Sequence, residues 1–164
     1  MQVVILMAIQ QRDGRMEIEG FGSATRELVD GFEQRIGFSL PDDYKEFLHL
    51  HNGGSAKRGY PTFILEALGE EVPLDVLYGL GVDEALDLRG WFDEYEKELM
   101  PGSIIIGSGA CGGMVTLVDN ADLKGVYFWD HAFAFPPSDE EGNTYYVAES
   151  FQAFIDYLNL PEPD

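Results

Sequence analysis

Two short helices are predicted near the start of the chain, because apolar residues recur there every three or four positions. The first covers residues 24–36, and its apolar face consists of Leu28, Phe32 and Ile36. Ser23 is the expected N-cap, and Gly37 is suited to end the helix in a left-handed conformation. The pattern therefore predicts a helix that buries one face.

The second helix is predicted to begin at Ser39–Pro41, where proline fits the first turn because its missing N–H would have no partner there. Asp42 and Asp43 follow at the positive end of the helix dipole, which favours carboxylates. The apolar face consists of Tyr44, Phe47, Leu48 and His51. The run Asn52-Gly53-Gly54 predicts the end of this helix.

Strands are predicted in the rest of the chain by β-prone runs between turn-forming residues. These runs are residues 62–65, 74–78, 103–106, 114–118, 126–129 and 145–147. Within the second run, Leu74, Val76 and Tyr78 are expected on one face of the sheet. The glycine-rich stretch 107–114 is interpreted as a loop between two strands, because neither a Gly-Lys-Ser/Thr nor a helix follows it.

Two further helices complete the prediction. One covers residues 83–99 and can be broken at Gly90, since glycine costs about 1 kcal/mol relative to alanine inside a helix. The last begins at Glu149 or Ser150, with Phe151, Phe154, Ile155 and Leu158 on its apolar face. Together the elements predict an α+β fold, with an antiparallel or mixed sheet of about six strands and about four helices.

The chain of 164 residues is expected to form one domain. Residues 23–160 are assigned to that domain, residues 1–22 to an N-terminal extension or first strand, and residues 161–164 to a tail. The apolar start has no basic region and no small-residue cleavage site, so it is not interpreted as a signal peptide. Whether translation starts at Met1 or Met16 is left open. The single cysteine suits a reducing cytoplasm.

The charged residues are distributed unevenly along the chain, with most of the negative charge in residues 66–164. The whole sequence has a formal net charge of −20, and residues 66–164 alone combine twenty-one acidic with three basic side chains. Such a surface argues against binding to nucleic acid and to anionic membranes, both of which require basic groups. It favours a basic protein partner, although a role in solubility alone is the alternative.

Candidate chemistry is sparse in this sequence. Cys111 lies among glycines and near carboxylates, which is not the positive setting that a nucleophilic cysteine requires. His49 and His51 are two residues apart, so on a helix they point in different directions and are poor joint metal ligands. No calcium-loop pattern is present in the sequence. We therefore expect no catalytic residues, no metal and no cofactor; an enzyme in which Cys111 meets His131 is the alternative.

The stretch GFEQRIGFSLPDDYKEFLHLHNGG at residues 31–54 resembles the N-terminal signature of the SUKH superfamily, the Smi/Knr type. The second half is also similar, with Ile104–Gly107, Gly125–Tyr127 and Val147–Phe154 in the expected order. The resemblance covers about residues 23–160. It implies a compact α+β fold without a catalytic set, and a bacterial immunity protein that neutralises a cognate toxin. The chain departs from the family pattern in loop 107–113, which lacks an acidic residue, and in the long acidic segment 66–100.

These observations predict a non-enzymatic protein that binds a basic, nucleic-acid-targeting toxin domain of the polymorphic type. A regulatory scaffold that binds several partners weakly is the alternative. The expected partner-binding acidic face consists of Asp83, Glu84, Asp87, Asp93, Glu94, Asp130, Asp139, Glu140 and Glu141. Tyr60 and Trp91 are the expected aromatic anchors, if they are exposed. The identity of the toxin and the oligomeric state are left open.

Overall fold

The computed structural model describes residues 16–160. The predictions for the apolar segment 1–10 and for the tail 161–164 fall outside the described residues. Four α-helices are described: α2 (Arg26–Ile36), α3 (Asp42–Leu50), α4 (Leu88–Tyr95) and α5 (Phe151–Tyr157), and a 3₁₀ helix, η1 (Glu84–Leu86), precedes α4. Among residues 16–160, no helix is long and apolar enough to cross a membrane.

The strands form one large sheet and one small one. The small sheet pairs β1 (Ile18–Glu19) with β2 (Ser55–Ala56). The large sheet contains β3 (Thr62–Leu65), β4 (Glu70–Leu77), β5 (Ser103–Gly109), β6 (Met114–Asp119), β7 (Lys124–Trp129) and β8 (Thr144–Ala148). Its strands are antiparallel and adjacent in sequence order. The predicted α+β class and six-stranded sheet are thus confirmed.

The large sheet curls, so that its edge strands β3 and β8 come close to each other. Phe63 on β3 lies 5.6 Å, ring centre to ring centre, from Phe128 on β7. The edge of β3 also pairs with the chain after α5, where the Thr62 and Asn159 backbones exchange hydrogen bonds of 2.9 and 2.8 Å. The curl gives the sheet an inner and an outer face.

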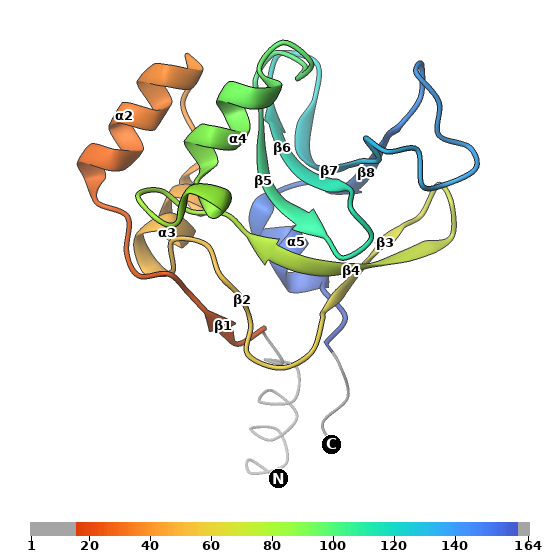
Figure 1. Ribbon diagram of the computed structural model, residues 1–164, viewed down its shortest axis with the longest axis horizontal. Helices are drawn as coiled ribbons and strands as arrows, with labels where there is room; N and C mark the ends of the chain where they lie inside the picture. Colours follow the sequence, from red (N-terminus) through yellow and green to blue (C-terminus); the bar gives the residue numbers. More distant parts are fainter. Residues whose placement is uncertain (1–15, 161–164) are drawn as a thin grey trace, which may run out of the picture.

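Successive residues of a strand point to opposite faces, so Phe128 and Trp129 mark the two sides of the sheet. The inner face, with Phe63 and Phe128, packs on α5, whose Phe154 lies 5.5 Å from Phe63. The outer face carries Trp129, which meets Tyr95 at the end of α4. Helix α4 therefore covers part of the outer face, as Figure 1 shows for its position over β5.

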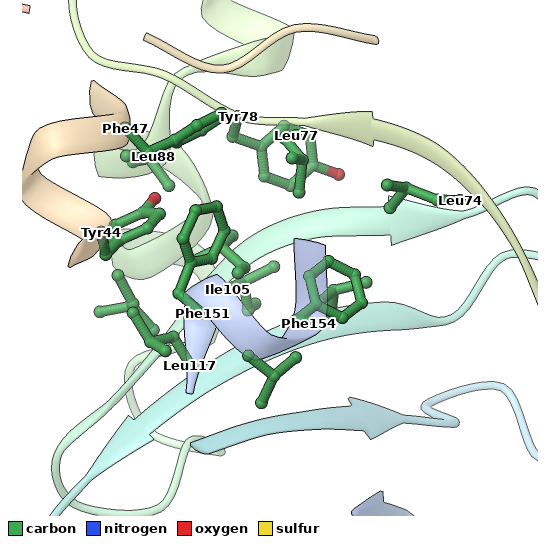
Figure 2. Packing of buried hydrophobic residues seen from close by; sticks show 14 of the residues in the cluster. Tyr44, Phe47, Leu74, Leu77, Tyr78, Leu88, Ile105, Leu117, Phe151 and Phe154 are labelled. Atoms are coloured by element: carbon green, nitrogen blue, oxygen red, sulfur yellow. The ribbon is translucent and has the colours of Figure 1, made fainter. Parts of the chain in front are cut away.

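The core is rich in aromatic residues where α3, α5 and the sheet meet (Figure 2). The ring of Phe151 on α5 lies 5.0 Å from that of Tyr44 and 4.8 Å from that of Phe47, both on α3. The predicted faces of α3 and α5 are thereby buried, apart from the half-buried His51 and Ile155. The buried Tyr44 hydroxyl finds no hydrogen-bond partner among the described residues.

The first helix starts later than predicted. Thr25, not Ser23, is the N-cap, and its hydroxyl accepts a hydrogen bond from the Leu28 N–H at 3.2 Å. Ser23 instead donates its hydroxyl proton to the carbonyl of His49 on α3. The Ser23 prediction was wrong because this tertiary contact takes the hydroxyl away from the helix. The left-handed end at Gly37 is confirmed by a φ of 84°.

The predicted helix over residues 83–99 is two helices. The break lies at Asp87, which ends η1 and caps α4 with its side chain, whereas Gly90 lies inside α4.

The prediction for strand 74–78 also needs correction, since a bulge between Leu74 and Val76 shifts the register of β4 against β5. Consequently Leu77 and Tyr78 are both buried, while Val76 is only half-buried.

The described ends of the chain lie on the same side of the molecule. Figure 1 shows β1 and the segment after α5 at the bottom of the view. Helix α4 and the loop between β7 and β8 lie at the top. Both ends are therefore remote from the upper side, where most of the predicted acidic residues lie.

Candidate partner-binding surface

Seven of the nine acidic residues predicted for a partner surface are exposed. Asp83 and Glu84 belong to η1 and its cap, and Asp93 and Glu94 belong to α4. Asp139–Glu141 form the second group, on the loop between β7 and β8. Figure 1 shows the α4 segment and this loop apart, on the two sides of the upper half of the molecule. The structure therefore places the predicted residues in two groups and does not bring them into one cluster.

The exposed carboxylates are mostly free of ion pairs. Among residues 16–160, the one such contact of these seven joins Asp93 to Arg35, at 2.9 Å between Oδ1 and Nη2. Basic side chains elsewhere pair with other carboxylates, as Lys45 does with Glu33 at 3.6 Å. The negative charge of both groups is therefore directed mainly to solvent.

Asp87 is buried and holds its own loop together. Its Oδ2 accepts hydrogen bonds from the Gly81 N–H at 2.9 Å and from the Arg89 guanidinium at 2.7 Å. Burial would raise the pKa of this carboxyl, but the hydrogen bonds from Arg89 and Gly81 outweigh it and hold the pKa below its usual value. Asp87 thus acts as a helix cap and is not part of the exposed surface.

Asp130 has a similar role after β7. It is only 1% exposed, and its carboxylate accepts hydrogen bonds from the Ala134 N–H at 2.8 Å, the Phe135 N–H at 2.9 Å and the Ser138 hydroxyl at 2.6 Å. Burial would raise the pKa of Asp130, yet these donors hold it below its usual value. The carboxylate therefore shapes the loop that carries Asp139–Glu141, and a partner cannot reach it directly.

Of the two predicted aromatic anchors, Trp91 is half-buried in a row of stacked rings. It lies between Tyr78 at 4.8 Å and Tyr95 at 6.0 Å, with nearly parallel planes, and its indole N–H donates to the Ala85 carbonyl. The row continues through Tyr95 to Trp129 and His131. Tyr60 is 60% exposed, but it belongs to the segment between β2 and β3. Figure 1 shows this segment at the bottom of the view, away from α4.

The structure also shows an exposed aromatic residue that the sequence analysis missed. Phe133 is 45% exposed and has a φ of 53°, a left-handed conformation that is rare for a bulky residue. Asp130 stabilises this turn, because its carbonyl accepts the Phe133 N–H at 3.1 Å and its carboxylate binds the next two N–H groups. Strained residues of this kind are over-represented at functional sites. No pattern in the sequence His-Ala-Phe-Ala-Phe indicates it.

A small cavity lies on the outer face of the sheet, between the chain that follows α4 and the start of β8. Its volume is about 170 Å³. Its lining includes Glu98, Ser103, Thr116, Trp129, Asn143 and Thr144. At its edge, His131 Nε2 lies 3.5 Å from Glu98 Oε2, and the rings of His131 and Trp129 meet at 4.9 Å.

Cys111 is exposed in the turn between β5 and β6. None of the hydrogen bonds within residues 16–160 joins it to a histidine, and His131 contacts Glu98, Tyr95 and Trp129. The described part of the chain also contains no group of three or more His, Cys, Asp or Glu residues arranged to hold a metal ion. The features that remain for recognition on the described part of the surface are its charge, its exposed aromatic groups and the small cavity beside Trp129.

Comparison with known proteins points to one family. The model of the SMI1 / KNR4 family (SUKH-1) matches residues 23–157. A Bacillus subtilis (strain 168) protein, described as SPbeta prophage-derived uncharacterized protein YokK, is similar to this chain. The two are 28% identical over 147 residues, which cover 80% of this chain and 72% of that protein. The match includes α2, the acidic segment with η1 and α4, and the loop before β8.

Proposed function

The chain belongs to the SMI1 / KNR4 family (SUKH-1), and on that basis we propose that it is an immunity-type protein. It binds a cognate bacterial toxin in the cytoplasm of the producing cell and neutralises it by direct contact, without catalysis. The partner is a basic toxin domain that acts on nucleic acid. Domains of this family are known as immunity-type proteins, which supports the general role.

The exposed, unpaired carboxylates are the observation that carries this proposal. Asp83, Glu84, Glu94 and Asp139–Glu141 are exposed and have no ion-pair partner within residues 16–160. A toxin that acts on nucleic acid must present a basic surface to the phosphates. When two partners carry electrostatic fields of opposite sign, their rate of association increases by factors of ten or more, and partners of the wrong charge are disfavoured.

Charge alone provides little affinity at an exposed surface, so an anchor is also needed. Phe133 is suited to this role, because it is exposed and the hydrogen bonds to Asp130 hold its turn in place. An anchor that is already ordered loses less entropy on binding. The exposed Phe133, which belongs to the same loop as the acidic run 139–141, is therefore proposed as the apolar contact of the partner interface.

Co-expression with the products of the genes adjacent to the gene of this chain tests the proposal. We expect a complex that survives purification at low salt and in which the toxin loses its activity. The variant D139N/E140Q/E141Q should lower the association rate about 10-fold at low ionic strength. The matched control E27Q/D30N/E46Q removes the same charge from exposed positions on α2 and α3 and should change the rate by less than about 2-fold.

Two results would contradict the proposal. One is the failure of any basic protein to co-purify at low salt. The other is capture of many proteins, each with weak affinity, which would favour a regulatory scaffold instead. Equal losses in the two triple variants would show that only the overall charge matters, and would contradict the assignment of the loop between β7 and β8.

A further inference from the structure

The cavity beside Trp129 offers hydrogen-bond acceptors on its floor. Ser103 and Thr116 are both buried there, and each hydroxyl donates its only proton within the protein. The Ser103 proton goes to the Met100 carbonyl at 2.6 Å, and the Thr116 proton goes to the Tyr127 carbonyl at 3.1 Å. A hydroxyl has one proton and two lone pairs, so both oxygens can only accept from a group that enters the cavity.

The walls of the cavity favour a positive charge. Glu98 adds a carboxylate at the rim, with 58% of its side chain exposed. The indole of Trp129 forms an aromatic wall, and Tyr95 and His131 hold it through edge contacts at 5.7 and 4.9 Å. Aromatic rings attract cations that lie within about 6 Å of the ring face. The amide of Asn143, which also lines the cavity, can serve either as donor or as acceptor and so is compatible with a cation.

The size of the cavity limits what can enter. Small-molecule sites in proteins usually measure about 300–1,000 Å³, whereas this cavity measures about 170 Å³. One long side chain fits this space better than a cofactor or a nucleotide. Two of its lining residues follow the two groups of exposed carboxylates in sequence, since Glu98 comes shortly after Asp93 and Glu94, and Asn143 comes shortly after residues 139–141.

From these observations we propose that the cavity receives one lysine or arginine side chain of the partner. The acceptor floor binds the N–H groups of the cation, Glu98 neutralises its charge, and Trp129 packs against its alkyl stem and cationic end. The identity of the partner rests on the proposed function. The preference of the cavity for a cation rests only on its own residues, so the two claims can be tested separately.

The test uses n-butylammonium and n-butylguanidinium, which mimic the ends of the two side chains. Each is titrated into the full-length protein at constant ionic strength, and two-dimensional NMR spectra follow the Trp129 indole, the Asn143 amide and the Thr144 backbone. We expect saturable shifts at these signals, with a Kd of about 10 mM. The cation that binds more tightly identifies lysine or arginine as the preferred guest. The proposal would be overturned if n-butanol caused chemical-shift changes as large as those of the two cations. It would also be overturned if the changes did not saturate and were spread over all the acidic segments.

A pair of variants separates the cavity from the general negative field. E98Q and E94Q each remove one charge from an exposed position in or just after α4, but only Glu98 lines the cavity. We expect E98Q to weaken binding of the butyl cations about fivefold, whereas E94Q should change it by less than about twofold. Equal effects would refute the proposal. If a toxin partner co-purifies but the butyl cations do not bind, the cavity proposal fails while the proposed function stands. If the butyl cations bind but no basic partner co-purifies, the cavity's preference for a cation stands while the proposed function fails.

Discussion

Two of the many carboxylates in this chain have a structural role that the sequence does not reveal. Asp87 caps α4 and binds Arg89, and Asp130 organises the turn that exposes Phe133. Both are buried, and donors keep both pKa values below the ordinary range. Nothing in the local sequence distinguishes them from their exposed neighbours, because their donors are placed by the fold. A single acidic residue is therefore a poor guide to an acidic surface.

The lowered pKa of Asp130 predicts how stability depends on pH. The Asp130 carboxyl becomes protonated at a lower pH in the folded protein than in the unfolded chain, where its pKa has the ordinary value of 3.8. The stability that Asp130 contributes is therefore present above about pH 4 and is lost as the pH falls through the lowered value. Asp130→Asn should reduce the free energy of unfolding by about 2 kcal/mol at pH 7. As the pH falls below 3.8 and through the lowered pKa of Asp130, this difference should shrink, as urea unfolding at several pH values will show.

Asp139→Asn is the control for this prediction. Its carboxylate also accepts two N–H groups, from Glu141 at 2.9 Å and Gly142 at 2.8 Å, but in an exposed turn. Water can replace those bonds, so the cost at pH 7 should stay below about 1 kcal/mol. A pH profile of Asp130→Asn parallel to that of the unmodified protein would contradict the role assigned to Asp130.

The elements of this fold were largely predictable, whereas their ends and irregularities were not. The faces of α3 and α5 follow from their apolar periodicity, because burial selects the same positions that the spacing indicates. Ser23 is lost as an N-cap because its hydroxyl binds the His49 carbonyl on α3, and the bulge after Leu74 occurs where β4 pairs with β5. The cavity near Trp129 is formed by parts of the chain far apart in sequence, so no local pattern could have indicated it.

The junction after α3 shows how an element end can support the whole fold. Asn52 has a φ of 53°, and its buried side chain both accepts from the Leu80 N–H and donates to the Leu80 carbonyl, each at 2.8 Å. At Gly53, a Cβ would lie 2.6 Å from the Leu77 carbonyl oxygen. The run that was predicted only to end a helix therefore also fixes α3 against the end of β4.

Asn52→Ala should lower the free energy of unfolding by about 3 kcal/mol, because the Leu80 N–H and carbonyl remain buried without partners. Asn120→Ala is the matched control. Asn120 also accepts and donates hydrogen bonds, but in the exposed turn between β6 and β7, so its loss should cost about 1 kcal/mol. Chemical unfolding of both variants measures the difference. Similar costs at the two positions would contradict the role of burial.

At the scale of the whole molecule, the fold tolerates a large excess of like charge. The formal net charge is −20. The few basic side chains form local ion pairs with some of the carboxylates, as Arg35 does with Asp93 and Glu96. The remaining carboxylates repel one another, which destabilises the compact state. The excess of exposed carboxylates is therefore maintained at some cost in stability.

Salt should consequently have opposite effects on folding and on binding. Raising NaCl from 10 mM to 300 mM shortens the screening length about fivefold. We expect a rise in Tm of about 4 °C for the free protein, since screening weakens the internal repulsion. The same change should weaken the complex with a basic partner. Thermal unfolding and binding measured across one salt series test both effects; a Tm that falls with added NaCl would contradict the expected repulsion.

The position of the chain ends has a practical consequence for such measurements. β1 and the segment that follows α5 lie at the bottom of Figure 1, opposite α4 and the loop between β7 and β8. A sensor-chip anchor, fluorescent fusion or affinity handle joined next to β1 or to the segment after α5 would lie on the side opposite α4 and the loop between β7 and β8. Protein immobilised at either of these two positions should therefore leave both acidic groups accessible to a dissolved partner.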